Sequence, residues 1–160
     1  MKRIKPTVII LLLIFLISIL SSCIAFEDKA LNSLGEYRSC EFYTCGGFQD
    51  YTDYAKYYYD SVDFTDNEYF SIIEQSDMDA LNEHLDNFES CIEAHGYSDA
   101  SSEIVVNYDF DRSVIDHKDY LYIESEKYGP WDDGSMVFAS YDIYFFDIQT
   151  NTLYYFHNNI

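Results

Sequence analysis

The stretch SDMDALNEHLDNFESCIEAHG, residues 76–96, decides the fold. Its apolar residues recur at spacings of three and four and form one stripe: Met78, Leu81, Leu85, Phe88 and Ile92. Ser76 is a good N-cap, Asp77 and Asp79 suit the positive first turn, and Gly96 fits the residue after the last turn. The pattern predicts an amphipathic helix from about Asp77 to His95 that packs its stripe against another element.

Strand-like segments on both sides of this helix supply the surface that it needs. Two segments rich in Tyr, Phe and Thr, residues 36–45 and 48–59, flank Gly46-Gly47, a dipeptide typical of a tight hairpin turn. The other expected strands are residues 68–73, 104–110, 119–125, 136–147 and 153–157, with a hairpin loop at 147–152. Because strands and helices do not alternate, we expect an α+β domain over residues 36–160. It would hold one helix across an antiparallel sheet of about five to seven strands.

Length and charge limit the classes of function. A chain of 160 residues with 48% hydrophobic residues has enough apolar surface for one domain. Nine basic residues against 29 acidic ones give a net charge of −20, which excludes nucleic acid as a partner. A surface this acidic favours a cationic partner, although solubility alone also accounts for it.

The N-terminus indicates export. Lys2, Arg3 and Lys5 precede an apolar run over residues 8–20, which is too short to cross a bilayer core and is typical of a signal peptide. The run ends in Leu20-Ser21-Ser22-Cys23, which resembles the lipobox of bacterial lipoproteins. Cleavage after Ala25, or retention of the segment as an uncleaved anchor, would export the chain as well.

The lipobox resemblance implies how the chain is processed. Residues 1–22 would be removed as the signal peptide, and the thiol of Cys23 would carry a diacylglycerol that holds the protein on the outer side of the membrane. Residues 23–35 would then form a membrane-proximal tether. The mature chain would keep six basic residues against 29 acidic ones, a net charge of −23. The ending, residues 141–160, resembles the closing hairpin of small, uncharacterised exported proteins of clostridia-type bacteria, a group that implies no activity.

Export also makes disulfides feasible. Apart from Cys23, the chain has Cys40, Cys45 and Cys91, so one thiol is left over from any internal bond. Cys40 and Cys45 point to opposite faces of their strand, and one of them can pair with Cys91 on the helix. The alternative is that all three are small buried thiols.

We find no motif for catalysis, for a cofactor or for a metal. There is no Gly-x-Ser-x-Gly, no Ser-x-x-Lys and no glycine-rich loop before a helix, and the acidic clusters lack the spacing of a calcium loop. Aromatic residues are the better candidates for contact with a partner, namely Trp131 in a turn-rich loop and Tyr54 and Tyr58 in a tyrosine-rich segment.

These features together predict a lipid-anchored, extracytoplasmic binding protein that is not an enzyme. The charge favours sequestration of a cationic peptide or protein, as immunity-type lipoproteins do. Two alternatives stay open, an envelope hydrolase that uses acidic residues and a structural component of the envelope.

Overall fold

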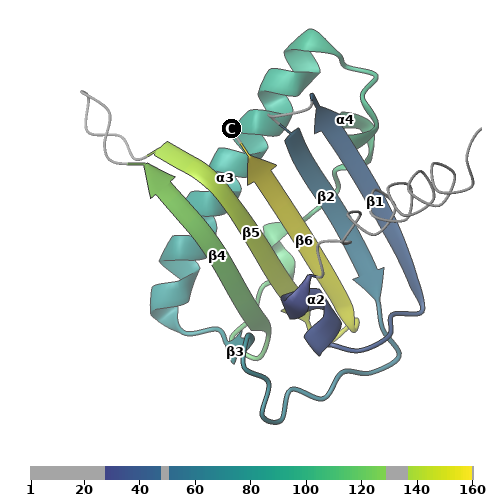
Figure 1. Ribbon diagram of the computed structural model, residues 1–160, viewed down its shortest axis with the longest axis vertical. Helices are drawn as coiled ribbons and strands as arrows, with labels where there is room; N and C mark the ends of the chain where they lie inside the picture. The colour runs from purple at the N-terminus through teal and green to yellow at the C-terminus, as the bar shows by residue number, and fades with distance from the viewer. Residues whose placement is uncertain (1–27, 48–50, 129–136, 160) are drawn as a thin grey trace, which may run out of the picture.

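The computed structural model describes residues 28–47, 51–128 and 137–159. In chain order, their helices and strands are α2 (Lys29–Ser33), β1 (Ser39–Gly46), β2 (Tyr51–Tyr58), β3 (Ser71–Ile72), α3 (Gln75–Ser98), α4 (Glu103–Asn107), the 3₁₀ helix η1 (Arg112–Val114), β4 (Tyr120–Tyr128), β5 (Val137–Asp147) and β6 (Thr152–Asn159). The strands form one antiparallel sheet in the order β1-β2-β6-β5-β4-β3. In Figure 1, α3 crosses behind this sheet and α2 lies in front of it. The predicted α+β architecture is confirmed.

α3 is the predicted helix, but it is longer at both ends. Its N-cap is Glu74 rather than Ser76, and the carboxylate of Asp77 accepts a hydrogen bond from the backbone N–H of Glu74 at 2.8 Å, one half of a capping box. Gly96 does not end the helix, which continues to Ser98. A Cβ atom at Gly96 would lie 3.6 Å from the side chain of Val105, so this glycine adjoins the chain of α4.

The helix side of the sheet carries the main core. The predicted stripe faces it, with Leu81, Leu85, Phe88 and Ile92 buried and Met78 partly buried. These side chains pack against buried residues of the middle strands: Tyr54, Tyr141, Ile143, Phe145 and Phe156. Each fully buried aliphatic or aromatic side chain of this kind stabilises a fold by about 1.5–3 kcal/mol, so the contact between α3 and the sheet holds the domain together.

Two of the expected strands differ from the structure. Residues 104–110 do not form a strand, since Ile104 is the buried residue of the short helix α4. In residues 68–73, only Ser71 and Ile72 pair with β4. A segment of six or seven residues is too short for periodicity to distinguish a strand from a helical turn, and for α4 the packing against α3 favours the helix.

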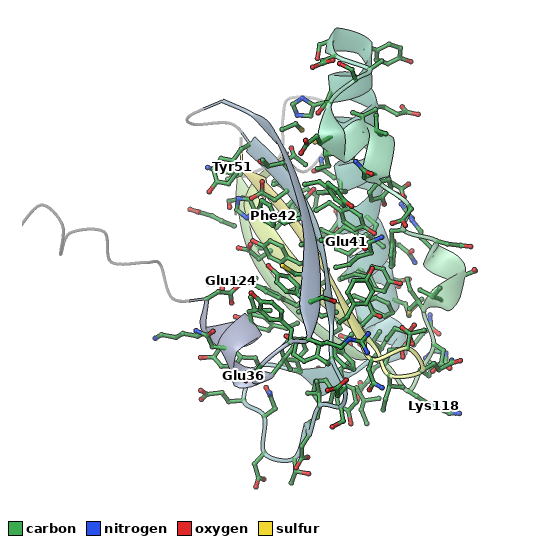
Figure 2. The ribbon with its side chains drawn as sticks, turned by 90° about the vertical axis from the view of Figure 1, so that its right-hand side faces the viewer. Glu36, Glu41, Phe42, Tyr51, Lys118 and Glu124 are labelled. Atoms are coloured by element: carbon green, nitrogen blue, oxygen red, sulfur yellow. The ribbon has the colours of Figure 1, made fainter. Side chains whose placement is uncertain are left out.

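The other side of the sheet, which we call the outer face, is only partly covered. α2 packs on it through the buried side chains of Ala30 and Leu34, which contact Tyr144, Phe146 and Leu153. The folded part therefore includes residues 28–35, which the sequence assigned to the tether. Figure 2 shows the sheet from its edge, with α2 and α3 on opposite sides of it.

Candidate functional site

The strand register places ionisable side chains from four strands in one line across the outer face. Asp53 of β2 lies opposite His157 of β6, His157 lies opposite Asp142 of β5, and Asp142 lies opposite Glu124 of β4. We call these four residues the acidic row. Neighbouring strands are roughly 4.8 Å apart, so the three carboxylates and the imidazole form a continuous polar line.

A line of tyrosines runs directly beside the acidic row. Tyr155, Tyr144 and Tyr122 are cross-strand neighbours on β6, β5 and β4, each two residues from a member of the acidic row. We call these three residues the tyrosine row. Their ring centroids are 5.0 Å apart between Tyr144 and Tyr155 and 5.7 Å apart between Tyr122 and Tyr144. The aromatic surface is therefore continuous along the row.

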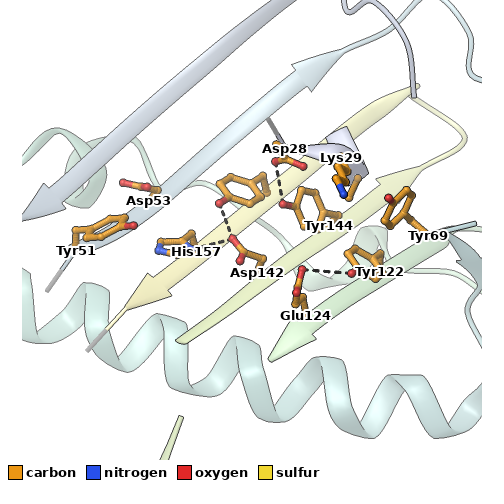
Figure 3. Close-up of a pocket in the computed structure, with 12 residues that line it drawn as sticks. Asp28, Lys29, Tyr51, Asp53, Tyr69, Tyr122, Glu124, Asp142, Tyr144 and His157 are labelled. Carbon is orange, nitrogen blue, oxygen red and sulfur yellow. Dashed lines mark hydrogen bonds and ion pairs between the residues drawn. The ribbon is translucent and has the colours of Figure 1, made fainter. Parts of the chain in front are cut away.

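The two rows line a groove of about 800 Å³. Figure 3 shows it with Asp28 and Lys29 above the tyrosine row and Tyr51 at the far end. Asp28 fixes α2 in this position, because its carboxylate caps the helix at the N–H of Leu31 and also accepts the hydroxyl of Tyr144, at 2.8 and 2.9 Å. The hydrogen bond from Tyr144 to Asp28 thus links β5, at the floor of the groove, to α2, at its wall.

Asp142 is the best-bonded carboxylate of the acidic row. One of its oxygens accepts the hydroxyl of Tyr155 at 2.6 Å and bonds Nδ1 of His157 at 2.8 Å. An ionised carboxylate only accepts, so Nδ1 carries the proton. Nε2 of His157 is buried and has no hydrogen-bond partner among the described residues, and the ring of Tyr51 stacks on this imidazole with centroids 4.8 Å apart. Figure 3 shows His157 between Tyr51 and Asp142.

Asp53, at the end of the acidic row, is a buried acid, and its contacts offset only part of the cost of burying an ionised carboxylate. Burial raises the pKa of its carboxyl group, and the hydrogen bond from Thr44 and the attraction of His157 only partly offset that effect. A nearby positive charge would favour the ionised form of this group. The site therefore holds a carboxylate that a cation would stabilise.

The charges around the groove are unbalanced. Its lining includes four carboxylates, those of Asp28, Asp53, Glu124 and Asp142, against the ammonium group of Lys29 and the imidazole of His157. Acidic groups next to aromatic faces attract ammonium and guanidinium groups, through charge and through the ring quadrupole. Among the described residues, no three His, Cys, Asp or Glu side chains converge as ligands for a metal ion.

None of the three residues predicted to contact a partner is described as lining the groove. The prediction for Tyr54 is wrong, because this side chain is fully buried on the helix side and donates its hydroxyl to Asp109 at 2.9 Å. Tyr58 is half-buried on the same side and donates to Glu41, so it lies away from the groove. Trp131 and the lipidation site Cys23 lie outside the described residues.

The three cysteines of the domain are free thiols in the structure. Burial, with smaller contributions from Asp53 and Cys91, raises the pKa of the Cys45 thiol to about 11. Burial also raises the pKa of Cys91. Both groups are therefore poor nucleophiles near neutral pH. The predicted disulfide of Cys40 or Cys45 with Cys91 stays a prediction.

The groove was not identified from the sequence, although a signal for it exists. β4, β5 and β6 each place a tyrosine two residues from an acid or a histidine, and an antiparallel register brings these pairs together.

In comparisons with known proteins, no family model, curated protein or solved structure matches the chain. None of the helices described is both long and apolar enough to cross a membrane.

Proposed function

We propose that this chain is a lipid-anchored, extracytoplasmic binding protein that sequesters a cationic peptide or protein, as immunity-type lipoproteins do. The observation that carries the proposal is the acidic row beside the tyrosine row in one groove. The lipobox at Cys23 supports the anchor and the location outside the cell.

The two rows suit different parts of a basic side chain. The aliphatic stem of Lys or Arg packs on an aromatic face, while the charged end reaches a carboxylate. Tyr122 and Tyr144 present such faces beside Glu124 and Asp142. The net charge of −20 adds long-range attraction, which raises the association rate for a basic partner.

One observation favours a second candidate function, an envelope hydrolase that uses acidic residues. His157 is oriented by Asp142 and lies beside Asp53, whose raised pKa suits a general acid. The described lining of the groove includes no Ser, Thr or Cys, so His157 or Asp53 would have to activate water. A hydrolase would turn over a bound peptide, whereas a binding protein would release it intact.

The test is a titration of the acylated protein in nanodiscs of neutral lipid with poly-lysine, followed by calorimetry and by mass spectrometry of the recovered polymer. We expect binding that weakens steeply between low and high salt. Asp142→Asn and Glu124→Gln should each weaken binding about threefold to tenfold. Glu93→Gln is the matched control, because it removes the same charge from an exposed position on α3.

Four results would contradict the proposal. Affinity that does not change with salt would exclude electrostatic recognition, and equal effects of Glu124→Gln and Glu93→Gln would place binding outside the groove. Cleavage of the polymer would favour the hydrolase. A protein that neither binds nor cleaves would favour a structural component of the envelope.

A further inference from the structure

β1 forms one edge of the sheet and is long enough to pair with another strand. It pairs with β2 over eight consecutive residues without a register shift, whereas β3 at the opposite edge has only two residues. Among the described strands, β2 is its only partner. Figure 2 looks at the molecule from the side of β1, with Glu41 and Phe42 labelled on its two faces.

The pairing of β2 shows which backbone N–H and C=O groups of β1 do not bond to β2. The N–H of Tyr59 donates to the carbonyl of Asn151 in the direction of β6, so even-numbered residues of β2 bond toward β1. Residues 39, 41, 43 and 45 lie opposite them and use their N–H and C=O groups within the sheet. The N–H and C=O groups of Cys40, Phe42 and Thr44 therefore point away from the sheet.

This edge lacks the devices that usually prevent pairing with another chain. Protected edges carry proline, lysine or bulges, and β1 contains no proline and no lysine. Its one charged residue, Glu41, is engaged on the helix side by Lys56 at 2.9 Å and by Tyr58 at 3.0 Å. Phe42 is 48% exposed beside the open backbone groups. The edge is open and partly apolar.

We propose that β1 accepts an extended segment of the cationic partner as an additional, antiparallel strand of the sheet. The proposal rests on the proposed function and names the form in which the partner binds. Thr44 continues the acidic row at Asp53, and Phe42 lies two residues along on the same face. A Lys or Arg opposite Thr44 thus extends toward Asp53, about two strand spacings or ~10 Å away, and an apolar residue packs beside Phe42.

Charge favours this occupant over a second copy of the chain. Two copies with a net charge of −20 each would repel on edge-to-edge pairing, whereas a basic segment would be attracted. α4 contacts β1 on the helix side, so side chains of the added strand on that side have to be small. The partner segment is thus one with basic and apolar residues alternating on the outer face and small residues between them.

The test uses the capped peptide Lys-Ser-Val-Ser-Lys-Ser-Val and two N-methylated versions of it. In an antiparallel pair, the amides of Lys and Val point to β1 and those of Ser point to solvent. Methylation of the Lys and Val amides should weaken binding at least about tenfold, since several backbone hydrogen bonds are lost. Methylation of the Ser amides should leave the affinity unchanged, although charge and composition are the same.

A variant of the protein gives an independent readout. Phe42→Pro removes an N–H that points away from the sheet and breaks no bond to β2, so it should abolish peptide binding while the fold remains. Phe42→Thr loses the same apolar side chain but keeps the N–H, so it should bind the peptide more weakly than wild type and more tightly than Phe42→Pro. If Phe42→Pro does not fold, the methylated peptides still decide.

The outcomes separate this proposal from the proposed function. If both methylated peptides bind like the parent and Asp142→Asn still weakens poly-lysine, strand addition is wrong and the groove function stands. If poly-lysine does not bind at all, the proposed function fails. Light scattering that shows a peptide-free dimer, which Phe42→Pro turns into a monomer, would make a second copy the occupant and overturn the proposal.

Discussion

Asp53 combines a stability penalty with a place in the candidate site. Its carboxyl group is buried, and burial raises its pKa above the ordinary value. A raised pKa means that the folded state favours the protonated acid, so the ionised group at neutral pH destabilises the fold. Residues that lower stability in this way are frequent at binding sites, because the same group gains energy from its ligand.

We therefore expect Asp53→Asn to stabilise the protein at pH 7, by about 0.5–1 kcal/mol. Wild-type stability should fall relative to the variant as the pH rises from 3.8 through the raised pKa of Asp53, and the two should converge at lower pH. Urea unfolding at pH 3.5 and pH 7 measures the difference. The same variant should bind poly-lysine more weakly. A variant that is less stable at pH 7 would show that the carboxylate is satisfied in the fold.

Which tyrosines of β2 lie on the outer face could not be predicted from the tyrosine-rich segment alone. Side chains alternate between the two faces of β2, and both faces carry tyrosines: Tyr54 and Tyr58 on the helix side, Tyr51 and Tyr57 on the outer face. With aromatic residues at both parities, the usual distinction between an apolar and a polar face is lost. The packing of α3 determines which face of β2 is buried, and Tyr54 lies on that face.

At the level of elements, the N-terminus of α3 offers a direct test. The carboxylate of Asp77 accepts the backbone N–H of Glu74, while Asp79 is exposed and follows the first turn of the helix. Asp77→Ala should lower the free energy of unfolding by about 1 kcal/mol, because it removes a cap and a charge that favours the helix N-terminus. Asp79→Ala removes only the charge and should cost less. Thermal unfolding of both variants checks this, and equal losses would show that the cap bond contributes nothing.

Long elements were predictable and short ones were not. α3 and the hairpin of β5 and β6 have enough residues for a clear period and a clear turn, so both were found from the pattern. The five-residue α4 is held by Ile104 in the core and by the salt bridge of the following Asp109 with Lys56. Neither contact can be predicted from the local sequence. Groove positions likewise depend on cross-strand register, which becomes known only once the strands are paired.

For the molecule as a whole, the position of α2 relates the groove to the expected anchor. Asp28 caps α2 at the wall of the groove and is five residues from Cys23 in the chain. Five extended residues span at most ~18 Å. If Cys23 carries the lipid, the groove is therefore held near the membrane surface, where a cationic peptide attracted to anionic lipid would pass.

Cys23→Ala should release this protein from the membrane. The thiol that would carry the diacylglycerol is lost, and a single short apolar segment does not replace two acyl chains. Fractionation of cells that export the chain, with intact-mass measurement, should show the acylated 23–160 form for wild type and no acyl mass for Cys23→Ala. Cys40→Ala, which removes an exposed thiol of β1, is the control and should stay acylated. Wild-type protein that keeps Met1 and carries no acyl mass would refute the anchor, and the groove would then have to meet its partner in another compartment.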